Sequence, residues 1–291
     1  MKLIKYFLEF IVVIFFFIIF KILGIKLSSN LSCYFFTIFG PLIRSSNKIS
    51  ENLKIVFPLI DKNKEGIIIK NMWCNYGRTF SEYMYLKNLY NNKNNYIKIN
   101  HLEKFEKLKK LNKPILFFSG HFANFELLAM YIVKQGFELS ALYRPLNNFF
   151  LNPIMEYLRK KYICKDQIPK SIPGKGKRGT RELIKRIKQR KNIALMIDQK
   201  VNEGITVKLF NKDAHTINIP AQLALKYGYI LQPISIKRTG DINFEITIED
   251  HIKILNDDDE KTVTQRLNKK LEQMILNNPN QWIWTHKRWK I

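Results

Sequence analysis

The chain is poor in cysteine and in long apolar runs. Its 291 residues include three cysteines, Cys33, Cys74 and Cys164, which lie far apart and form no C-x-x-C pair. This spacing indicates neither a zinc site nor a redox pair, and it favours a reducing compartment. The chain shows no collagen, coiled-coil or solenoid period, so fibrous and repeat proteins are excluded. A single long apolar run, at the amino terminus, excludes a protein that crosses a membrane many times.

Acidic residues are also scarce. The sequence has 24 Asp and Glu against 49 Lys and Arg, a formal net charge of +25. Partners that carry phosphate or carboxylate groups follow from such a charge: nucleic acid, an anionic membrane or an acidic protein. Drift of the composition toward Lys, Asn and Ile accounts for part of the charge. The hydrophobic fraction of 46% is enough for a packed core, so wholesale disorder is excluded.

The apolar run near the amino terminus predicts a membrane anchor. Residues 10–20 contain no charge, and the run extends over 6–23 when its edges are included. This length is borderline for a span of about 20 residues, and no small-residue cleavage site of a signal peptide follows it. A buried core helix is disfavoured because the run has no polar face. We expect an uncleaved anchor over residues 1–26, which spans the membrane or lies in its surface. The basic residues after it place residues 27–291 on the cytoplasmic side.

Beyond the anchor, short apolar strands alternate with amphipathic helices. Residues 45–113 are mostly helical in pattern, and after them the pattern predicts strands at 114–120, 137–143, 192–198, 205–210, 230–236 and 244–248, and helices at 124–136, 149–162, 180–191, 220–226 and 262–276. Such alternation is typical of an α/β fold with a mostly parallel central sheet flanked by helices. No linker divides residues 27–291, so we expect one domain.

The strongest candidate for chemistry is the segment 119–126, SGHFANFE. A predicted strand ends here, and open α/β sheets bind ligands at the carboxyl ends of their strands. His121 and Glu126 can meet if the histidine lies in the turn and the helix begins near Asn124, a plausible N-cap. A carboxylate on one imidazole nitrogen leaves the other free to accept a proton, which makes a general base. The alternative is a histidine in an ordinary turn before an amphipathic helix.

Two further motifs bear on whether the reaction uses a covalent enzyme intermediate or a nicotinamide cofactor. The sequence contains no G-x-S-x-G and no Ser or Cys at a sharp elbow, so the base would act on a substrate hydroxyl without a covalent enzyme intermediate. Residues 174–179 fit G-x-G-x-x-G, and Asp198 lies nineteen residues beyond the last glycine. The preceding segment 162–173 is polar and contains prolines, which disfavours a central strand and with it a nicotinamide cofactor. Contact of this loop with phosphate stays a weaker expectation.

The segment with His121 resembles the H-x4-D/E motif of glycerolipid-type acyltransferases, and its neighbours resemble the late acyltransferases of lipid A biosynthesis, the lauroyl/myristoyl transferase family. Four other blocks resemble that family in the same order: Trp73–Arg78 with Glu82; Tyr143-Arg144-Pro145; Asp198-Gln199 with Gly204, Val207 and Phe210; and Trp284–Lys290. The resemblance runs from the anchor to the end of the chain. Asn211 departs from the family's usual glycine, which puts the local turn in doubt.

The resemblance implies transfer of an acyl chain from acyl carrier protein, or from coenzyme A, to a hydroxyl of a lipid A precursor, at the inner membrane and without a metal or cofactor. His121 would be the base and Glu126 would orient it. Arg144 would stabilise the oxyanion or bind an acceptor phosphate, and Asp198 and Gln199 would position the acceptor sugar. Two alternatives stay open: an acyltransferase for another lipid acceptor, such as a glycerophospholipid or an aminolipid, and a basic membrane-binding protein without activity.

A basic belt at residues 159–191 carries fourteen Lys and Arg against two acids. A phosphorylated glycolipid, anionic headgroups and an acidic carrier protein would all be attracted to it. The expected phosphate contacts are Arg159, Lys177, Arg178 and Arg181. Nucleic acid is the rival partner, but no recognition motif is present and the anchor argues against it. The closing segment 281–290, with three Trp, fits either a membrane interface or the domain core.

Overall fold

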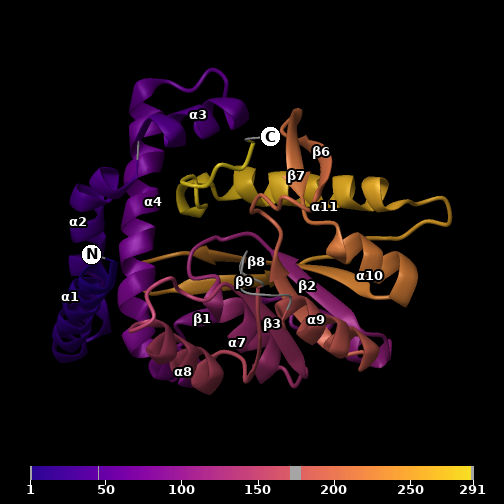
Figure 1. The fold of residues 1–291 in the computed structure, drawn as a ribbon, viewed down its shortest axis with the longest axis horizontal. Helices are drawn as coiled ribbons and strands as arrows, with labels where there is room; N and C mark the ends of the chain where they lie inside the picture. The colour runs from indigo at the N-terminus through magenta and orange to yellow at the C-terminus, as the bar shows by residue number, and fades with distance from the viewer. Residues whose placement is uncertain (1, 45, 171–177, 290–291) are drawn as a thin grey trace.

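The computed structural model describes residues 2–44, 46–170 and 178–289, and they form a mostly parallel sheet covered by helices on both faces (Figure 1). The sheet has seven strands in the order β1-β9-β8-β2-β5-β3-β4. The strands are β1 (Ile97–Asn100), β2 (Ile115–Ser119), β3 (Leu139–Tyr143), β4 (Asp166–Pro169), β5 (Asn192–Met196), β8 (Ile230–Arg238) and β9 (Phe244–Ile248). Among the described strand pairs of this seven-stranded sheet, β8–β9 alone is antiparallel. The predicted α/β class is confirmed.

The helices separate into two groups in space. Along the left of Figure 1 lie α1 (Lys2–Leu23), α2 (Ile25–Ile43) and α4 (Lys62–Glu82), with α3 (Ser46–Val56) above them. The remaining helices surround the sheet: α5 (Leu86–Asn91), α6 (Glu103–Lys110), α7 (Glu126–Lys134), α8 (Asn152–Tyr162), α9 (Arg178–Lys188), α10 (Ile219–Tyr227) and α11 (Glu260–Asn277), with the short 3-10 turns η1 (Tyr83–Tyr85) and η2 (Pro279–Gln281). Of the helices described, α1 alone is long and apolar enough to cross a membrane by length and composition.

Some strands carry too weak a pattern to be predicted. β1 has four residues and β4 contains Pro169, which a strand tolerates at an edge because its missing N–H is not needed there. Both strands lie at the edges of the sheet. β6 (Ile205–Leu209) pairs with β7 (Lys212–Thr216) in a separate hairpin whose two-residue turn is Phe210-Asn211. Asn211 has φ 59°, a left-handed conformation that asparagine tolerates, so the missing glycine is accommodated.

Helices α2 and α4 are in unusually close contact. A Cβ added to Gly77 of α4 would lie 2.1 Å from the backbone oxygen of Ser32 in α2, so only glycine allows this approach. Cys33 and Cys74 form a disulfide between the same two helices, with Cα atoms 4.0 Å apart. The sequence predicted thiols in a reducing compartment, and the structure corrects this prediction for the pair. Cys164 is free and buried.

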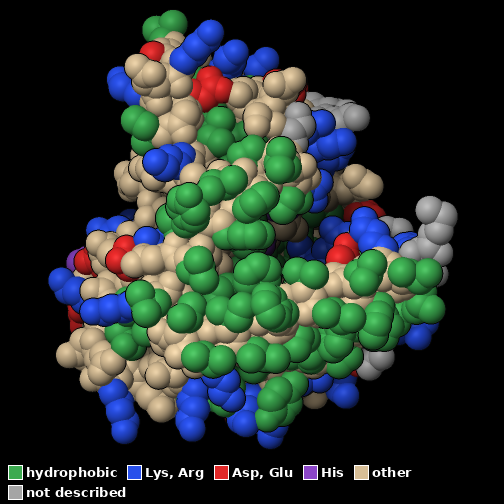
Figure 2. All heavy atoms as spheres, turned by 90° about the vertical axis from the view of Figure 1, so that its left-hand side faces the viewer, with side chains coloured by type: hydrophobic (Ala, Val, Ile, Leu, Met, Phe, Trp, Pro, Cys, Tyr) green, Lys and Arg blue, Asp and Glu red, His purple; other side chains and the backbone are tan. Residues whose placement is uncertain are grey.

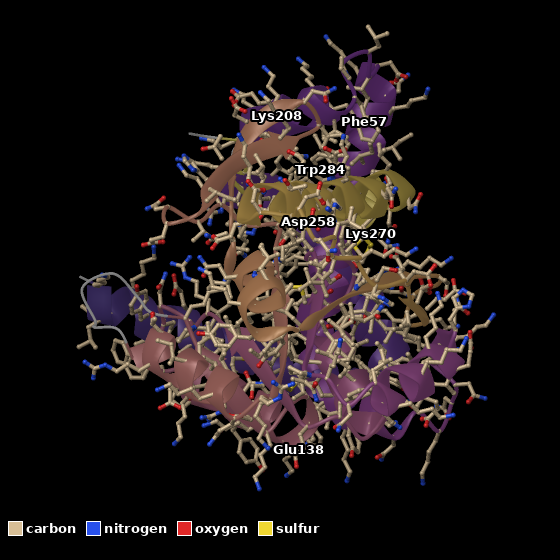
Figure 3. The ribbon with its side chains drawn as sticks, turned by 90° about the vertical axis from the view of Figure 1, so that its right-hand side faces the viewer. Phe57, Glu138, Lys208, Asp258, Lys270 and Trp284 are labelled. Carbon is tan, nitrogen blue, oxygen red and sulfur yellow. A yellow bond between two sulfur atoms is a disulfide. The ribbon has the colours of Figure 1, made fainter. Side chains whose placement is uncertain are left out.

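The carboxyl ends of the parallel strands face the last residues of the chain. Glu138 immediately precedes β3 and therefore marks the amino end of that strand. In Figure 3 it lies at the bottom of the molecule, whereas Trp284 lies in the upper half. Trp284 is fully buried, and its ring centroid lies 6.3 Å from that of Phe57, just after α3. The helices at the left of Figure 1, the closing segment and the carboxyl ends of the strands therefore border the same region of the molecule.

We expect Gly77→Ala to lower the free energy of unfolding by about 1–3 kcal/mol, because the new methyl group must push α2 away from α4. Gly66→Ala is the matched control on the same helix: its Cβ meets nothing within 4 Å, and alanine favours helix by about 1 kcal/mol. Urea unfolding followed by circular dichroism checks both variants. Equal or greater stability of Gly77→Ala would show that the two helices can separate without cost.

Candidate active site

His121 lies in the turn between β2 and α7, at the carboxyl edge of the sheet. The residue before it must be small: a Cβ on Gly120 would lie 2.7 Å from the ring of Phe122 and 3.2 Å from Oδ2 of Asp198. Ala123 has φ 44°, which is uncommon for a residue with a side chain. The tight turn therefore brings the main chain and the imidazole of His121 against the next strand.

The left-handed turn is held by α4 and the closing segment. The carbonyl oxygen of Ala123 accepts hydrogen bonds from Asn75 Nδ2 at 3.3 Å and Thr79 Oγ1 at 3.2 Å, both on α4. The backbone N–H of Ala123 donates to the carbonyl of Gln281 at 3.2 Å. Strain of this kind persists only where the surroundings over-determine it. The turn is thus fixed from two sides by segments distant in sequence.

A carboxylate holds the imidazole of His121, and it belongs to Asp198. Asp198 follows β5, the parallel neighbour of β2, so both residues emerge at the same edge. Nδ1 of His121 is 2.7 Å from Oδ1 of Asp198, and the backbone N–H of His121 donates to Oδ2 at 2.7 Å. Trp282 Nε1 donates to Oδ2 at 2.9 Å. The buried carboxylate therefore receives three hydrogen bonds.

The charge of Asp198 decides the tautomer of His121. Burial opposes ionisation of Asp198, but the imidazole and the hydrogen bonds of His121 outweigh it and lower the pKa of the carboxyl below its usual range. An ionised carboxylate can only accept, so Nδ1 of His121 carries the proton. The free lone pair of neutral His121 is then on Nε2, and its neighbour there is Gln199 Nε2 at 3.4 Å. This is the arrangement of a general base.

Glu126 has different partners from those expected. Its Oε1 accepts from Arg159 Nε at 2.9 Å, from Arg159 Nη2 at 2.6 Å and from the hydroxyl of Tyr83 at 2.5 Å. Burial opposes the charge of Arg159, but Glu126 outweighs it and raises the guanidinium pKa. The carboxylate of Glu126 thus belongs to a buried ion pair between α7 and α8, while Asp198 takes the expected place on the imidazole.

Asn124 is also placed differently from the expectation. α7 begins at Glu126, and the residue before it makes no side-chain cap. Asn124 instead donates from Nδ2 to Oε2 of Glu82 at 2.9 Å. Glu82 is fully buried and forms an ion pair with Arg238 of β8, which also donates to Asn75. This polar network lies behind the turn and accounts for the W-x-N…E block of the sequence.

The closing segment supplies two residues, Trp282 and His286, that the sequence did not predict at the site. Gln199 Nε2 lies 3.4 Å from Nε2 of His286 as well as from His121, and the two imidazole centroids are 6.1 Å apart. Burial lowers the pKa of His286 to about 4. Trp282 and Trp284 are buried, so this segment belongs to the core and the alternative of a membrane interface is wrong for these two residues. The spacing of single residues gave no signal for these contacts.

A cavity of about 340 Å³ opens beside His121, between the sheet and helices α7 and α8. Most of its wall is apolar, and the polar lining residues are Ser119, His121, Glu126, Tyr143, Arg144, Asn147, Arg159, Gln167, Lys170 and Gln199. Ser119 Oγ and Arg159 Nη1 are buried and have no hydrogen-bond partner among the described residues. An apolar cavity with few converging polar groups is the usual form of a small-molecule site.

Some of the other predicted substrate contacts line the cavity, and others do not. Arg144 lines the cavity, whereas Arg181 is exposed on α9 and does not line it. Arg159, another expected phosphate contact, also lines the cavity, where it is buried in an ion pair with Glu126. Lys177, with most of the G-x-G-x-x-G segment, and the side chain of Arg178 lie outside the described part of the structure. Among the described residues, no group of three or more His, Cys, Asp or Glu could hold a metal ion.

The family model for bacterial lipid A biosynthesis acyltransferases matches residues 1–291. The chain belongs to this family. It is therefore an acyltransferase enzyme of lipid A biosynthesis, acting on a lipid A-type acceptor, and the predicted family is confirmed. No curated protein matches the chain. The apolar α1 is consistent with the membrane association of such an acyltransferase.

We expect the pH dependence of stability to contain a contribution from His286. Burial lowers its pKa to about 4 from an ordinary value of about 6.5, so between these limits the unfolded chain binds a proton that the folded chain does not. Stability therefore falls as the pH falls through this window, by about 2 kcal/mol between pH 7 and pH 5. Urea unfolding of the wild type and His286→Gln at both pH values checks this, since the variant should lose less. Equal losses would mean that folding does not lower the pKa of His286.

Proposed function

We propose that this acyltransferase moves a fatty acyl chain from a thioester donor to a hydroxyl of a phosphorylated glycolipid, with His121 as the general base and Asp198 as its orienting carboxylate. The contact that carries the proposal is the 2.7 Å approach of His121 Nδ1 to Asp198 at the mouth of an apolar cavity. Neither a nucleophilic Ser or Cys elbow nor a metal is invoked, in accord with direct attack by the acceptor.

The proposed groups account for the proton that moves and for the bonds that form and break. The acceptor hydroxyl gives its proton to Nε2 of His121 as its oxygen attacks the thioester carbonyl carbon. Asp198 stabilises the imidazolium that forms. The tetrahedral intermediate then collapses, the carbon–sulfur bond breaks, and His121 returns the proton to the departing thiolate. The base contributes typically ~10²–10⁴ in rate.

The developing oxyanion needs a donor within the cavity. Arg159 Nη1 is buried and has no hydrogen-bond partner in the described ranges, and its other nitrogens are held by Glu126 and Tyr83. A preorganised cation in a water-poor site stabilises a developing negative charge without reorganising. Glu126 would then act by fixing Arg159, and Arg144 at the cavity wall is the second donor. This division differs from the expectation that Glu126 orients the imidazole.

The acyl chain would occupy the apolar part of the cavity. Phe117, Ala194 and Ala141 lie in register on β2, β5 and β3, and all three line it. They lie about 7 Å from the carboxyl end of β2, two residues before Ser119. On the other wall, Ile132 lies about 9 Å along α7 from Glu126. The thioester at His121 would thus direct its chain down between the sheet and α7.

The mouth of the cavity suits a phosphate. Arg144 and Lys170 both line it, and burial lowers the pKa of Lys170. A phosphate of the acceptor would complement these cations. Acyl carrier protein, an acidic donor, would be attracted to the exposed basic side of α9, including Arg181. We keep the expected arrangement of an anchor over residues 1–26 and a catalytic domain over 27–291 facing the cytoplasm, with no cofactor.

Asp198→Asn should lower kcat by about 10²–10⁴, because an amide no longer holds His121 in the productive tautomer. His121→Ala should lose at least as much. Glu126→Gln should lose less, since it leaves the contact between His121 and Asp198 intact. Transfer of labelled acyl groups from acyl carrier protein to purified lipid A precursor, with products identified by mass spectrometry, measures all three.

Asp257→Asn is the matched control for this series, because Asp257 is exposed and its carboxylate lies outside the site. Full activity of Asp198→Asn together with inactivity of Glu126→Gln would overturn the assignment of the orienting carboxylate. A product formed only on another lipid acceptor would retain the mechanism and replace the substrate.

Ala194→Leu and Ala141→Leu should shift the preference of the enzyme toward shorter acyl donors, because each adds bulk at the same level of the cavity. Competition among donors of different chain length, with the products resolved by mass spectrometry, gives this preference independently of the total activity. Ala224→Leu makes the same change in a buried site of α10 that does not line the cavity. An unchanged preference in both cavity variants would place the acyl chain elsewhere.

A further inference from the structure

Helix α1 presents an apolar stripe to solvent along its whole length. Ile4, Ile11 and Ile18 are spaced seven residues apart on this stripe and are 64%, 47% and 56% exposed. α2 continues the apolar surface with Leu27, which is 61% exposed, and Leu42, which is 81% exposed. Figure 2 shows hydrophobic side chains as a nearly continuous band across this face, with lysine and arginine gathered at its margins. A patch of this size on a soluble surface marks a partner or a membrane.

The opposite side of α1 packs on the domain at both of its ends. Near the amino end, Asn148 Nδ2 donates to the carbonyl of Tyr6, and the ring centroids of Phe10 and Phe150 are 5.8 Å apart. Near the carboxyl end, Phe17 and Phe20 are buried, and Phe17 lies 5.2 Å from Phe80 of α4. The helix therefore lies along the surface of the domain and does not project from it.

This packing is incompatible with α1 standing across a bilayer. A helix that crosses the hydrocarbon core needs about 30 Å of apolar surroundings, and the loop 148–150 together with η1 would have to enter the bilayer with it. The polar groups of Asn148 and of Glu9, which that loop contacts, would then lie in hydrocarbon. The lysines of α1 stand at both of its ends, Lys2 and Lys5 at one and Lys21 at the other, and Glu9 lies between them.

We propose that α1 and the exposed side of α2 lie flat in a single leaflet, with the lysines at both ends of α1 in the same layer of anionic headgroups. An interfacial helix buries its apolar face at the boundary between headgroups and acyl chains, and each nearby lysine adds about 1 kcal/mol of attraction to anionic lipid. The occupant of this face is therefore a lipid leaflet.

This topology places the mouth of the catalytic cavity at the membrane surface. Arg144, Leu146 and Asn147 line the cavity, and the next residue, Asn148, bonds to α1. The same short loop thus forms part of the cavity wall and part of the membrane face. A lipid acceptor can reach the cavity by lateral movement from the leaflet, without leaving it for water. The topology itself does not depend on which acceptor is used.

Depth measurement along the stripe tests the proposal. Single cysteines at Ile4, Ile11 and Ile18 of the full-length protein take a fluorescent label with little background, since Cys164 is buried and Cys33 is joined to Cys74. In vesicles of phosphatidylcholine and phosphatidylglycerol, lipid-borne quenchers near the headgroup or near the chain end report depth. A flat helix gives the three labels the same shallow depth. A spanning helix buries the label at Ile11 about 10 Å deeper than the other two, and this result would overturn the proposal.

Sidedness gives an independent test in cells. Lys2→Cys should react with a membrane-impermeant thiol reagent in inside-out vesicles and stay protected in intact spheroplasts. Lys26→Cys is the control, because it follows α1 and lies on the cytoplasmic side in either topology. Labelling of Lys2→Cys from outside the spheroplast would show a spanning helix. If the label at Ile11 resists both quenchers and Ile11→Cys instead forms disulfides between copies, the face is a dimer interface and the proposal fails.

Discussion

The contact between His121 and Asp198 is the interaction on which the site depends. A carboxylate that is almost fully buried is costly unless its lone pairs are occupied, and here the imidazole, a backbone N–H and the indole of Trp282 occupy them. The same three hydrogen bonds join β2, β5 and the closing segment. The orientation of the proposed base and the packing of the fold at this edge therefore depend on the same hydrogen bonds.

The polar network behind the turn also helps to hold His121 in place. Ala123 stays in its uncommon conformation because α4 and Gln281 hold its carbonyl and its N–H. Behind them, Glu82 and Arg238 neutralise each other in the core, where either charge alone would be strongly destabilising. Helix α4 thus does two things: it supports the turn on one side and packs against α2 on the other. The turn that carries the proposed base and the proposed membrane face are therefore connected through one helix.

The sequence predicted the alternation of strands and helices and the location of His121 at a strand end, because these depend on local patterns of apolar residues. It did not identify the partner of His121. Asp198 ends a strand predicted over 192–198, but the pairing of β2 with β5 brings it to the imidazole, and strand order is not encoded in local pattern. Glu126 was predicted because it is close to His121 in sequence. Its carboxylate instead forms an ion pair with Arg159 of α8, so it does not contact the imidazole. The edge strands β1 and β4 were too short or too polar to recognise.

The participation of Trp282 and His286 has a consequence for synthesis. The proposed base, its carboxylate and the indole that completes the hydrogen bonding come from residues 121, 198 and 282, so a nascent chain holds no finished site until residue 282 has left the ribosome. The amino-terminal helices are translated first and can meet lipid long before that moment. In the proposed topology, the enzyme therefore acquires its reactivity only after its amino-terminal helices have met the lipid leaflet.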